Sequence, residues 1–196
     1  RVIINTTFYK GIQKANASLV TDKIQQIVAE GIITEDGKLH DLDTLILSTG
    51  FHPREYMRPI NLTGKHGADI NEIWQHKVKA YRSLLIPEFP NLFLMLGPNT
   101  PIGNFSVIAM SEVQINYILQ LIKAWQNRQF DIIEVTEGTA TKFQRYATEG
   151  LKNTAWVGGC QSWYLDQNGE ASLWPYTWQR WVDEMQEPHW PDLILS

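Results

Sequence analysis

The sequence contains a single cysteine, Cys160, so no disulfide can form within the chain. A lone thiol fits a reducing compartment, and we expect a cytoplasmic protein. No apolar run approaches the roughly 20 residues that span a bilayer. The first residues also lack the long apolar region of a signal peptide. We therefore expect no membrane association.

The chain also has little excess charge of either sign. Its 17 basic and 21 acidic residues leave a net charge of −4. A nucleic-acid-binding surface needs clustered positive charge, so we expect no nucleic-acid partner. A hydrophobic content of 43% is typical of a globular protein with a substantial core.

Several catalytic motifs are missing. The five histidines show no H-x-x-x-H spacing and have no cysteine nearby, so no metal site is indicated. The absence of G-x-S-x-G removes support for an α/β-hydrolase. No G-x-G-x-x-G occurs either, so the phosphate-binding fingerprint of a dinucleotide-binding domain is absent.

The most informative segment is 89–108, which reads FPNLFLMLGPNTPIGNFSVI. It predicts an apolar strand at 92–96, a turn rich in glycine, proline and asparagine, and a helix at about 105–127 with Asn104 as its N-cap. Such a turn presents free backbone N–H groups and the positive end of the helix dipole, which favour an anionic ligand. An ordinary strand-to-helix turn is the alternative interpretation.

The predicted helix has a narrow polar stripe formed by Glu112, Asn116, Gln120 and Lys123. Apolar residues fill most of the remaining circumference. A helix with so wide an apolar arc is expected to be mostly buried.

The first 50 residues carry strand signals. Short strands are expected at 24–28 and 31–34, and Asp36-Gly37 would join the second of these to 38–42 in a hairpin. The continuous apolar run 44–47 predicts a strand that is buried on both faces.

The second half of the chain predicts a strand at 130–135, a polar helix at about 137–151, a hairpin around Asn168-Gly169 and a last helix opened by Pro175. Six of the eight tryptophans lie between Trp156 and Trp190. Core packing is the ordinary interpretation of these residues, and an aromatic-binding surface is the alternative.

Three segments in order resemble the C-terminal part of the flavin-containing and Baeyer–Villiger monooxygenases. They are LDTLILSTGF at 42–51, FPNLF through GPNT at 89–100, and GGCQSWY at 158–164 followed by LWP at 173–175. The resemblance covers nearly the whole chain. It implies an α/β fold that forms the C-terminal portion of a flavoprotein with two dinucleotide-binding domains, in which strands and hairpins pack on a long buried helix.

The resemblance also implies a division of the chain. Residues 1–50 would supply the C-terminal strands of the NAD(P)H-binding domain, and 51–88 would lead back to the FAD domain. Residues 89–196 would form the C-terminal part of the FAD-binding domain with a helical and hairpin tail.

In the family, a flavin reduced by NADPH transfers one oxygen atom from O₂ to a small organic substrate, either by N or S oxidation or by Baeyer–Villiger oxidation of a ketone. The implied cofactors are FAD and NADPH. The implied partners are the substrate, O₂ and the remainder of the flavoenzyme chain. No catalytic residue and no metal ligand is assigned. The residues implied to lie at the cofactors are Gly97, Pro98, Asn99, Thr100, Gly103, Asn104, Phe105, Thr49 and Gly50.

The chain departs from the family pattern in three ways. Both G-x-G-x-x-G fingerprints are missing, Ser48 replaces an alanine, and Gly103-Asn104-Phe105 stands where many Baeyer–Villiger members have Gly-His-Asn. We therefore expect a truncated fragment that is inactive alone. One alternative is another two-domain flavoprotein of the disulfide-reductase type, although the chain contains no cysteine pair for its chemistry. A second alternative is a non-enzymatic aromatic-rich binding module.

The missing fingerprints lead to a prediction about flavin absorbance of the purified chain. Without a dinucleotide-binding fingerprint, the chain is expected to show no stoichiometric flavin band in the visible blue. A flavin band at one equivalent per chain would contradict the prediction that this chain alone cannot hold the cofactor.

Overall fold

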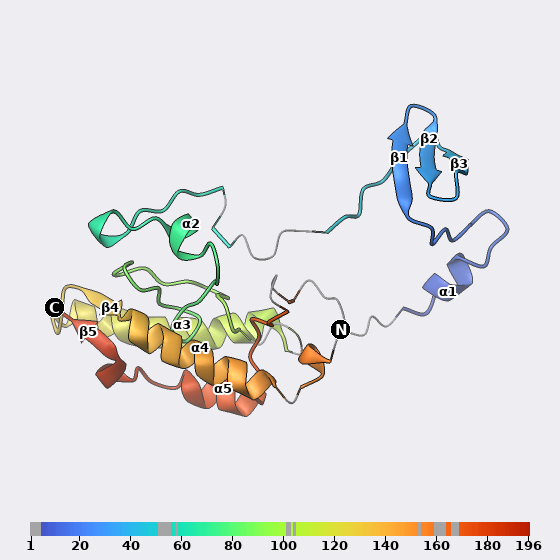
Figure 1. Ribbon diagram of the computed structural model, residues 1–196. Coiled ribbons are helices and arrows are strands. Elements are labelled where there is room, and N and C mark those ends of the chain that lie inside the picture. Colours follow the sequence, from blue (N-terminus) through green and yellow to red (C-terminus); the bar gives the residue numbers. More distant parts are fainter. Residues whose placement is uncertain are drawn as a thin grey trace. The chain divides into compact units, whose positions relative to one another are not determined.

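The chain folds into two compact units, Arg1–Phe51 and His52–Ser196 (Figure 1). The computed structural model describes residues 5–50, 56–57, 59–100, 103, 105–152, 154–158, 164–165 and 169–196.

The N-terminal unit is built on a three-stranded antiparallel sheet with the order β1-β2-β3. Its elements are α1 (Phe8–Gly11), β1 (Ile24–Val28), β2 (Gly31–Thr34) and β3 (Leu39–Asp41). The hairpin predicted around Asp36-Gly37 is confirmed, because β2 and β3 pair across this turn. Gly37 has a φ of +79°, a conformation that glycine adopts without strain.

The strand predicted at 44–47 is wrong, because this segment has no regular secondary structure. Ile46 and Leu47 are 82% and 69% exposed. A doubly buried strand needs neighbouring strands to pair its backbone. The described residues of this unit form only the three-stranded sheet, so the apolar run lacks the sheet that would bury it.

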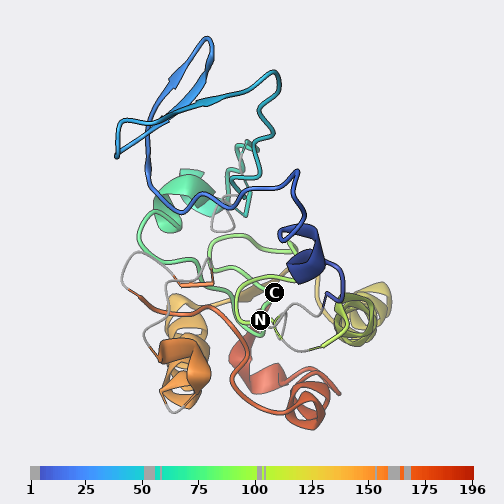
Figure 2. The same ribbon diagram turned by 90° about the vertical axis from the view of Figure 1, so that its right-hand side faces the viewer.

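The C-terminal unit combines three longer helices with a segment of largely irregular backbone. The helices are α3 (Val107–Gln126), α4 (Glu137–Leu151) and α5 (Trp178–Glu184). They run roughly parallel in Figure 1 and are seen from one end in Figure 2. The shorter elements are η1 (Lys65–Gly67), α2 (Ile70–Ile73), β4 (Ile133–Val135), η2 (Ala155–Val157), η3 (Trp190–Asp192) and β5 (Leu193–Leu195).

The main core lies where the irregular segment meets the helices. Tyr81, Leu84 and Leu85 come from the segment, and Tyr117 and Leu121 come from α3. The other members are Ala124, Phe130, Ile133, Val135, Ala140, Phe143, Trp174, Trp181 and Met185. Each large apolar side chain buried in this way contributes roughly 1.5–3 kcal/mol.

Two tryptophans of the C-terminal region are core residues. Trp181 is fully buried and Trp174 is 4% exposed. Their rings meet edge to face with centroids 5.2 Å apart, a favourable aromatic geometry. Core packing is therefore confirmed for this pair, and neither ring is available to an aromatic-binding surface. Trp163 lies outside the described residues.

The start of α3 differs from the prediction. The helix begins at Val107 rather than at 105, and its N-cap is Ser106 rather than Asn104. The Ser106 hydroxyl accepts a hydrogen bond from the Ala109 N–H at 3.4 Å. Serine and asparagine both cap helices well, so local preference could not choose between two such residues in one short stretch.

Three residues of the polar stripe of α3 are exposed, Glu112, Asn116 and Lys123, whereas Gln120 is half-buried and donates to the Gln186 carbonyl. The prediction that the rest of the helix is buried holds for only part of its circumference. Ile108 is 70% exposed and Leu119 is 53% exposed, although both lie in the apolar arc.

The strand predicted at 92–96 is also wrong. Asn91 and Leu96 have φ angles of +58° and +56°, which interrupt an extended backbone at both ends of the segment. The Leu94 N–H donates to the Leu84 carbonyl at 2.8 Å, but no ladder follows from this bond. The segment is therefore a loop rather than a strand, and of its five residues Leu94 is buried.

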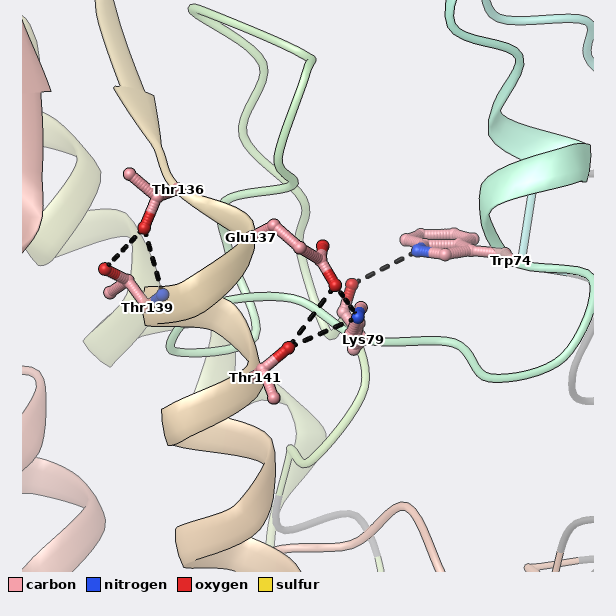
Figure 3. Close-up of polar contacts among 6 residues, drawn as sticks. All are labelled: Trp74, Lys79, Thr136, Glu137, Thr139 and Thr141. Atoms are coloured by element: carbon pink, nitrogen blue, oxygen red, sulfur yellow. Dashed lines mark hydrogen bonds and ion pairs between the residues drawn. The ribbon is translucent and has the colours of Figure 1, made fainter.

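The helix predicted at about 137–151 is confirmed, because α4 spans Glu137–Leu151. Glu137 in its first turn forms an ion pair with Lys79, and the Lys79 carbonyl accepts a hydrogen bond from the Trp74 indole N–H at 3.1 Å. Figure 3 shows how these contacts, together with the Thr141 hydroxyl, join α4 to the segment that follows α2.

The strand predicted at 130–135 is shorter than expected. β4 covers Ile133–Val135 and pairs antiparallel with β5 at the far end of the chain. The sequence did not predict β5, because three apolar residues at a chain end carry no periodicity.

The final helix starts later than predicted. α5 begins at Trp178, and the Thr177 hydroxyl caps it by accepting from the Arg180 N–H, so Pro175 lies in the preceding loop. Of the second predicted hairpin, the described residues show one antiparallel bridge between Leu165 and Ala171. Its Asn168 lies outside the described residues.

The cap of α4 gives a stability prediction. The Thr136 hydroxyl accepts from the Thr139 N–H at 3.0 Å. Thr136→Ala is expected to lower the free energy of unfolding by about 1 kcal/mol, because a first-turn N–H loses its partner. Urea unfolding measures the change. The control is Lys142→Ala at an exposed position of the same helix, which is expected to stay within about 0.5 kcal/mol of wild type. Equal effects would contradict the capping role.

Candidate functional site

Unusual backbone conformations concentrate in the irregular segment that precedes α3. Six of the eight non-glycine residues with positive φ among the described residues lie between positions 82 and 99: Arg82, Ser83, Glu88, Asn91, Leu96 and Asn99. A non-glycine residue in this region costs free energy, so the surrounding structure must hold it there. Clusters of such residues favour a site that needs a fixed geometry.

The loop 97–100 is a tight, buried turn. The N–H and the hydroxyl of Thr100 both donate to the Gly97 carbonyl, the hydroxyl at 2.6 Å. The Asn99 N–H donates to the Ser172 carbonyl at 3.0 Å, which ties the loop to the C-terminal region. Gly97, Pro98, Asn99 and Thr100 are all buried, so the structure brings these four predicted site residues together.

Two glycines of the site pack directly against other parts of the protein. A Cβ atom on Gly97 would lie 2.3 Å from the Ser83 carbonyl oxygen, and one on Gly103 would lie 2.5 Å from the Trp156 ring. Phe105 is half-buried, and its ring centroid lies 5.3 Å from that of Trp178. Protein atoms therefore already fill the space beside both glycines.

Buried polar groups without partners surround the loop. The side chains of Ser83, Asn99 and Gln114 are fully buried. The Ser83 hydroxyl, both amide atoms of Asn99 and the Gln114 Nε2 make no hydrogen bond. A buried polar group left unpaired costs about 1–3 kcal/mol, so each of these groups needs an explanation.

Gln114 is a site residue that the sequence reasoning missed. Its Oε1 accepts a hydrogen bond from the Leu96 N–H at 2.9 Å and so attaches the loop to the middle of α3. A signal was present in the sequence. Gln114 lies two residues from both Glu112 and Asn116, which places it about 200° away from the polar stripe on the helix. A polar residue on the buried side usually has a specific partner.

The N-terminus of α3 is the positively polarised part of the site. The first-turn N–H groups of a helix have no partner within it, and the helix dipole adds partial positive charge. Val107 and Ile108 in this turn are 42% and 70% exposed, so a ligand can approach it. Gly103 and Phe105 lie in the loop before the helix rather than in its first turn. Asn104 lies outside the described residues.

The other two predicted site residues, Thr49 and Gly50, belong to the N-terminal unit and are exposed. Gly50 has a φ of +87°, and no atom would contact a Cβ added there. The backbone therefore turns here in a way that favours glycine.

A second polar cluster joins the irregular segment to the C-terminal end. Arg82 forms an ion pair with Glu184 at 2.7 Å and donates from Nε to the Tyr81 oxygen at 2.8 Å. The Tyr81 hydroxyl donates to Asp192 at 2.7 Å, and Asp192 also lies 3.1 Å from His189. The ion pair and the hydrogen bond of Arg82 hold the irregular segment around residues 81–82 against α5. This role is structural.

Burial shifts the pKa values of two tyrosine hydroxyls in this region. Burial raises the pKa of the Tyr81 hydroxyl above its ordinary value, and it raises the pKa of Tyr117 to about 12. Both hydroxyls therefore stay protonated near neutral pH. The described residues contain no cluster of three or more metal-binding side chains and no helix long and apolar enough to cross a membrane.

Comparison with known proteins identifies relatives along almost the whole chain. No protein-family model matches it. An uncharacterised monooxygenase of Mycobacterium tuberculosis is 39% identical over 176 residues, covering 90% of this chain and 36% of that protein. A Baeyer–Villiger monooxygenase of Pseudomonas aeruginosa is 32% identical over 183 residues, covering 91% of this chain and 35% of that protein.

Solved structures agree with these relatives. A closed crystal structure of cyclohexanone monooxygenase matches with a TM-score of 0.88 at 25% identity, over 100% of this chain and 39% of that chain. The resemblance to Baeyer–Villiger-type monooxygenases is confirmed. A crystal structure of OTEMO in complex with FAD and NADP matches with a TM-score of 0.89 at 21% identity, over 100% of this chain and 38% of that chain, a likeness of fold alone.

The comparisons also confirm the α/β fold class, as a portion of a Baeyer–Villiger-type monooxygenase structure. The chain spans little more than a third of the length of the curated relatives it matches. The resemblance that was read from the order of the three segments agrees with these comparisons.

The packing of Gly97 gives a prediction with opposite outcomes at two glycines. Gly97→Ala is expected to lower the free energy of unfolding by about 1–3 kcal/mol, because the new methyl group meets a backbone carbonyl that cannot rotate away. Gly138→Ala in α4 meets its nearest atom at 3.7 Å, an ordinary contact, and is expected to raise stability by about 0.4–1 kcal/mol. Urea unfolding of both variants tests the pair. A change of the same sign in both would contradict the tight packing at the loop.

Proposed function

We propose that this chain is the C-terminal part of an FAD- and NADPH-dependent monooxygenase that transfers one oxygen atom of O₂ to a small organic substrate. The names of the relatives favour Baeyer–Villiger oxidation of a ketone over N or S oxidation. The observation that carries the proposal is the buried loop 97–100, which leads to the N-terminus of α3 and contains an amide without partners.

The division of the chain follows from this proposal. Residues 1–50 would contribute strands to the NADPH-binding domain, and their apolar run 44–47 would become a buried strand once neighbouring strands are present. Residues 51–88 would connect the domains, and 89–196 would complete the FAD-binding domain. The single cysteine supports a cytoplasmic enzyme.

The residues present fit a flavin in two respects. The Asn99 amide has one acceptor and two donor positions, all unused, and the pyrimidine edge of a flavin offers both donors and acceptors. The N-terminus of α3 supplies positive polarisation, worth roughly 0.3–2 kcal/mol toward an anionic group. Because Asn99 has no exposed surface, we infer that the side chains around it shift when the ligand binds.

When bound, FAD supplies the redox and oxygen-transfer chemistry, and the protein supplies position and electrostatics. In this chain the Thr100 and Ser172 contacts would hold the loop, and Gln114 would hold Leu96 at its start. Asn99 would orient the pyrimidine edge, and the first turn of α3 would stabilise negative charge there. Phe105, Gly103 and Asn104 would line the approach to the flavin, and Thr49 and Gly50 would lie beside NADPH.

A chimera tests the proposal. The unmatched part of the Pseudomonas aeruginosa enzyme is joined to this chain, and bound FAD and NADPH-dependent O₂ consumption are measured. We expect one FAD per chain. Asn99→Gly removes the amide while allowing the same positive φ, and is expected to weaken FAD binding about 10-fold, the effect of one or two hydrogen bonds.

Asn91→Gly is the matched control. Asn91 also has a positive φ, but its amide pairs with residues 131 and 133, away from the loop. This variant is expected to lose stability without weakening FAD binding. Equal FAD affinity in wild type and Asn99→Gly would contradict the role of Asn99, and a folded chimera without FAD would contradict the proposed function.

A further inference from the structure

The region between α4 and α5 contains an apolar cluster that is separate from the main core. Its members, here called the small core, come from the end of α4, from η2 and from the neighbourhood of the bridge that follows: Leu151, Trp156, Tyr164, Leu165, Ala171 and Leu173. Three of them, Leu151, Ala171 and Leu173, are at most 3% exposed. Because buried side chains pack closely, the backbone that carries them has a fixed position.

The small core holds the loop 97–100 through Ser172. This residue lies between Ala171 and Leu173, so its backbone is fixed on both sides. Its carbonyl accepts the hydrogen bond from the Asn99 N–H at 3.0 Å. Asn99 has a φ of +67°, a conformation that its surroundings must maintain. The backbone position of Asn99 therefore depends on the small core.

Trp156 supplies a second contact from the same small core. Its ring lies against Gly103, where an added Cβ would be 2.5 Å from Cζ2 and 2.8 Å from Cη2. Gly103 is buried and lies four residues after Asn99 and four before Val107, the first residue of α3.

The Trp156 ring is itself held from behind. It meets the Tyr164 ring edge to face, with centroids 5.1 Å apart, a favourable aromatic geometry. The backbone before it is tied to the end of α4, because the N–H and the hydroxyl of Thr154 both donate to the Leu151 carbonyl, the hydroxyl at 2.7 Å. The ring is thus a firm support for Gly103 rather than a side chain that can swing aside.

The two contacts together do more than either does alone. A single hydrogen bond at Asn99 fixes one point and leaves the chain free to turn about it. A second support at Gly103, from the same small core, removes that freedom. The direction of the unpaired Asn99 amide is therefore set by both contacts.

We propose that Trp156 is a positioning residue for the cofactor: it transmits the rigidity of the small core to Gly103 and so fixes the direction in which the Asn99 amide meets the flavin. The inference rests on the proposed function and adds to it a residue that acts through the loop. A small side chain at position 156 would leave the Ser172 bond intact but let the chain turn about it.

The first test measures FAD affinity in the chimera with the Pseudomonas aeruginosa enzyme. Trp156→Ala is expected to weaken FAD binding about 10-fold, as the loss of the Asn99 amide does, because the amide is no longer aimed at its partner. Trp156→Phe keeps an aromatic ring against Gly103 and is expected to restore most of the affinity. Trp190→Ala is the matched control, because it removes a tryptophan that packs on Phe130 instead, and it is expected to bind FAD as wild type does.

A double variant separates positioning from a general loss of stability. If Trp156 acts through Asn99, Trp156→Ala combined with Asn99→Gly binds FAD about as weakly as Asn99→Gly alone. Independent effects would instead multiply to a loss of about 100-fold.

The second test uses the isolated chain and needs no cofactor. Gly103→Ala is expected to lower the urea midpoint, because the new methyl group meets a ring that cannot retreat. In a Trp156→Ala background the methyl group has space, so Gly103→Ala is expected to cause little further change. Such coupling is the signature of a direct contact.

Four outcomes would overturn the inference: wild-type FAD affinity in Trp156→Ala, no recovery in Trp156→Phe, a multiplied loss in the double variant, or additive midpoint shifts in the isolated chain. A folded wild-type chimera without FAD would reject the proposed function. Coupling between Gly103 and Trp156 in the isolated chain would in that case still support the positioning of the loop by Trp156.

Discussion

The C-terminal unit depends on the burial of an irregular backbone segment, 81–100, against three helices. Each N–H and carbonyl of such a segment must find a partner outside any regular ladder. The bonds from Leu94 to the Leu84 carbonyl and from Leu96 to Gln114 show how this is done, one contact at a time. The core around Tyr117 and the ion pair between Arg82 and Glu184 of α5 hold this segment in place.

The same constraint explains the candidate site. Gly97 packs directly against the Ser83 carbonyl, and hydrogen bonds to Thr100 and Ser172 fix the turn that follows. The positive φ and the unpaired amide of Asn99 are therefore held in place by the surrounding contacts. Strain and unpaired polar groups that gather at one place are typical of a site prepared for a ligand.

Among the described residues, apolar side chains stay exposed in both units. In the N-terminal unit they include Ile46 and Leu47, and on α3 they include Ile108 and Leu119. The curated relatives are much longer than this chain.

The sequence by itself determined the elements that local chemistry controls. The Asp36-Gly37 hairpin, the extent of α4 and the polar stripe of α3 follow from turn geometry, capping and helical periodicity. These features depend on residues that lie close together in the chain. The order of three short segments also indicated the resemblance to Baeyer–Villiger-type monooxygenases, although these segments lie far apart in the chain.

The tertiary structure decided what depends on distant residues. The apolar sequence 92–96 became a loop because Asn91, which bonds to residues 131 and 133, and Leu96, which bonds to Gln114, are held at positive φ. β5 formed because β4 was available to pair with it, and Gln114 became a site residue because Leu96 lies beside it. In each case the deciding partner lies far away in the sequence, and only the packed chain brings the two together.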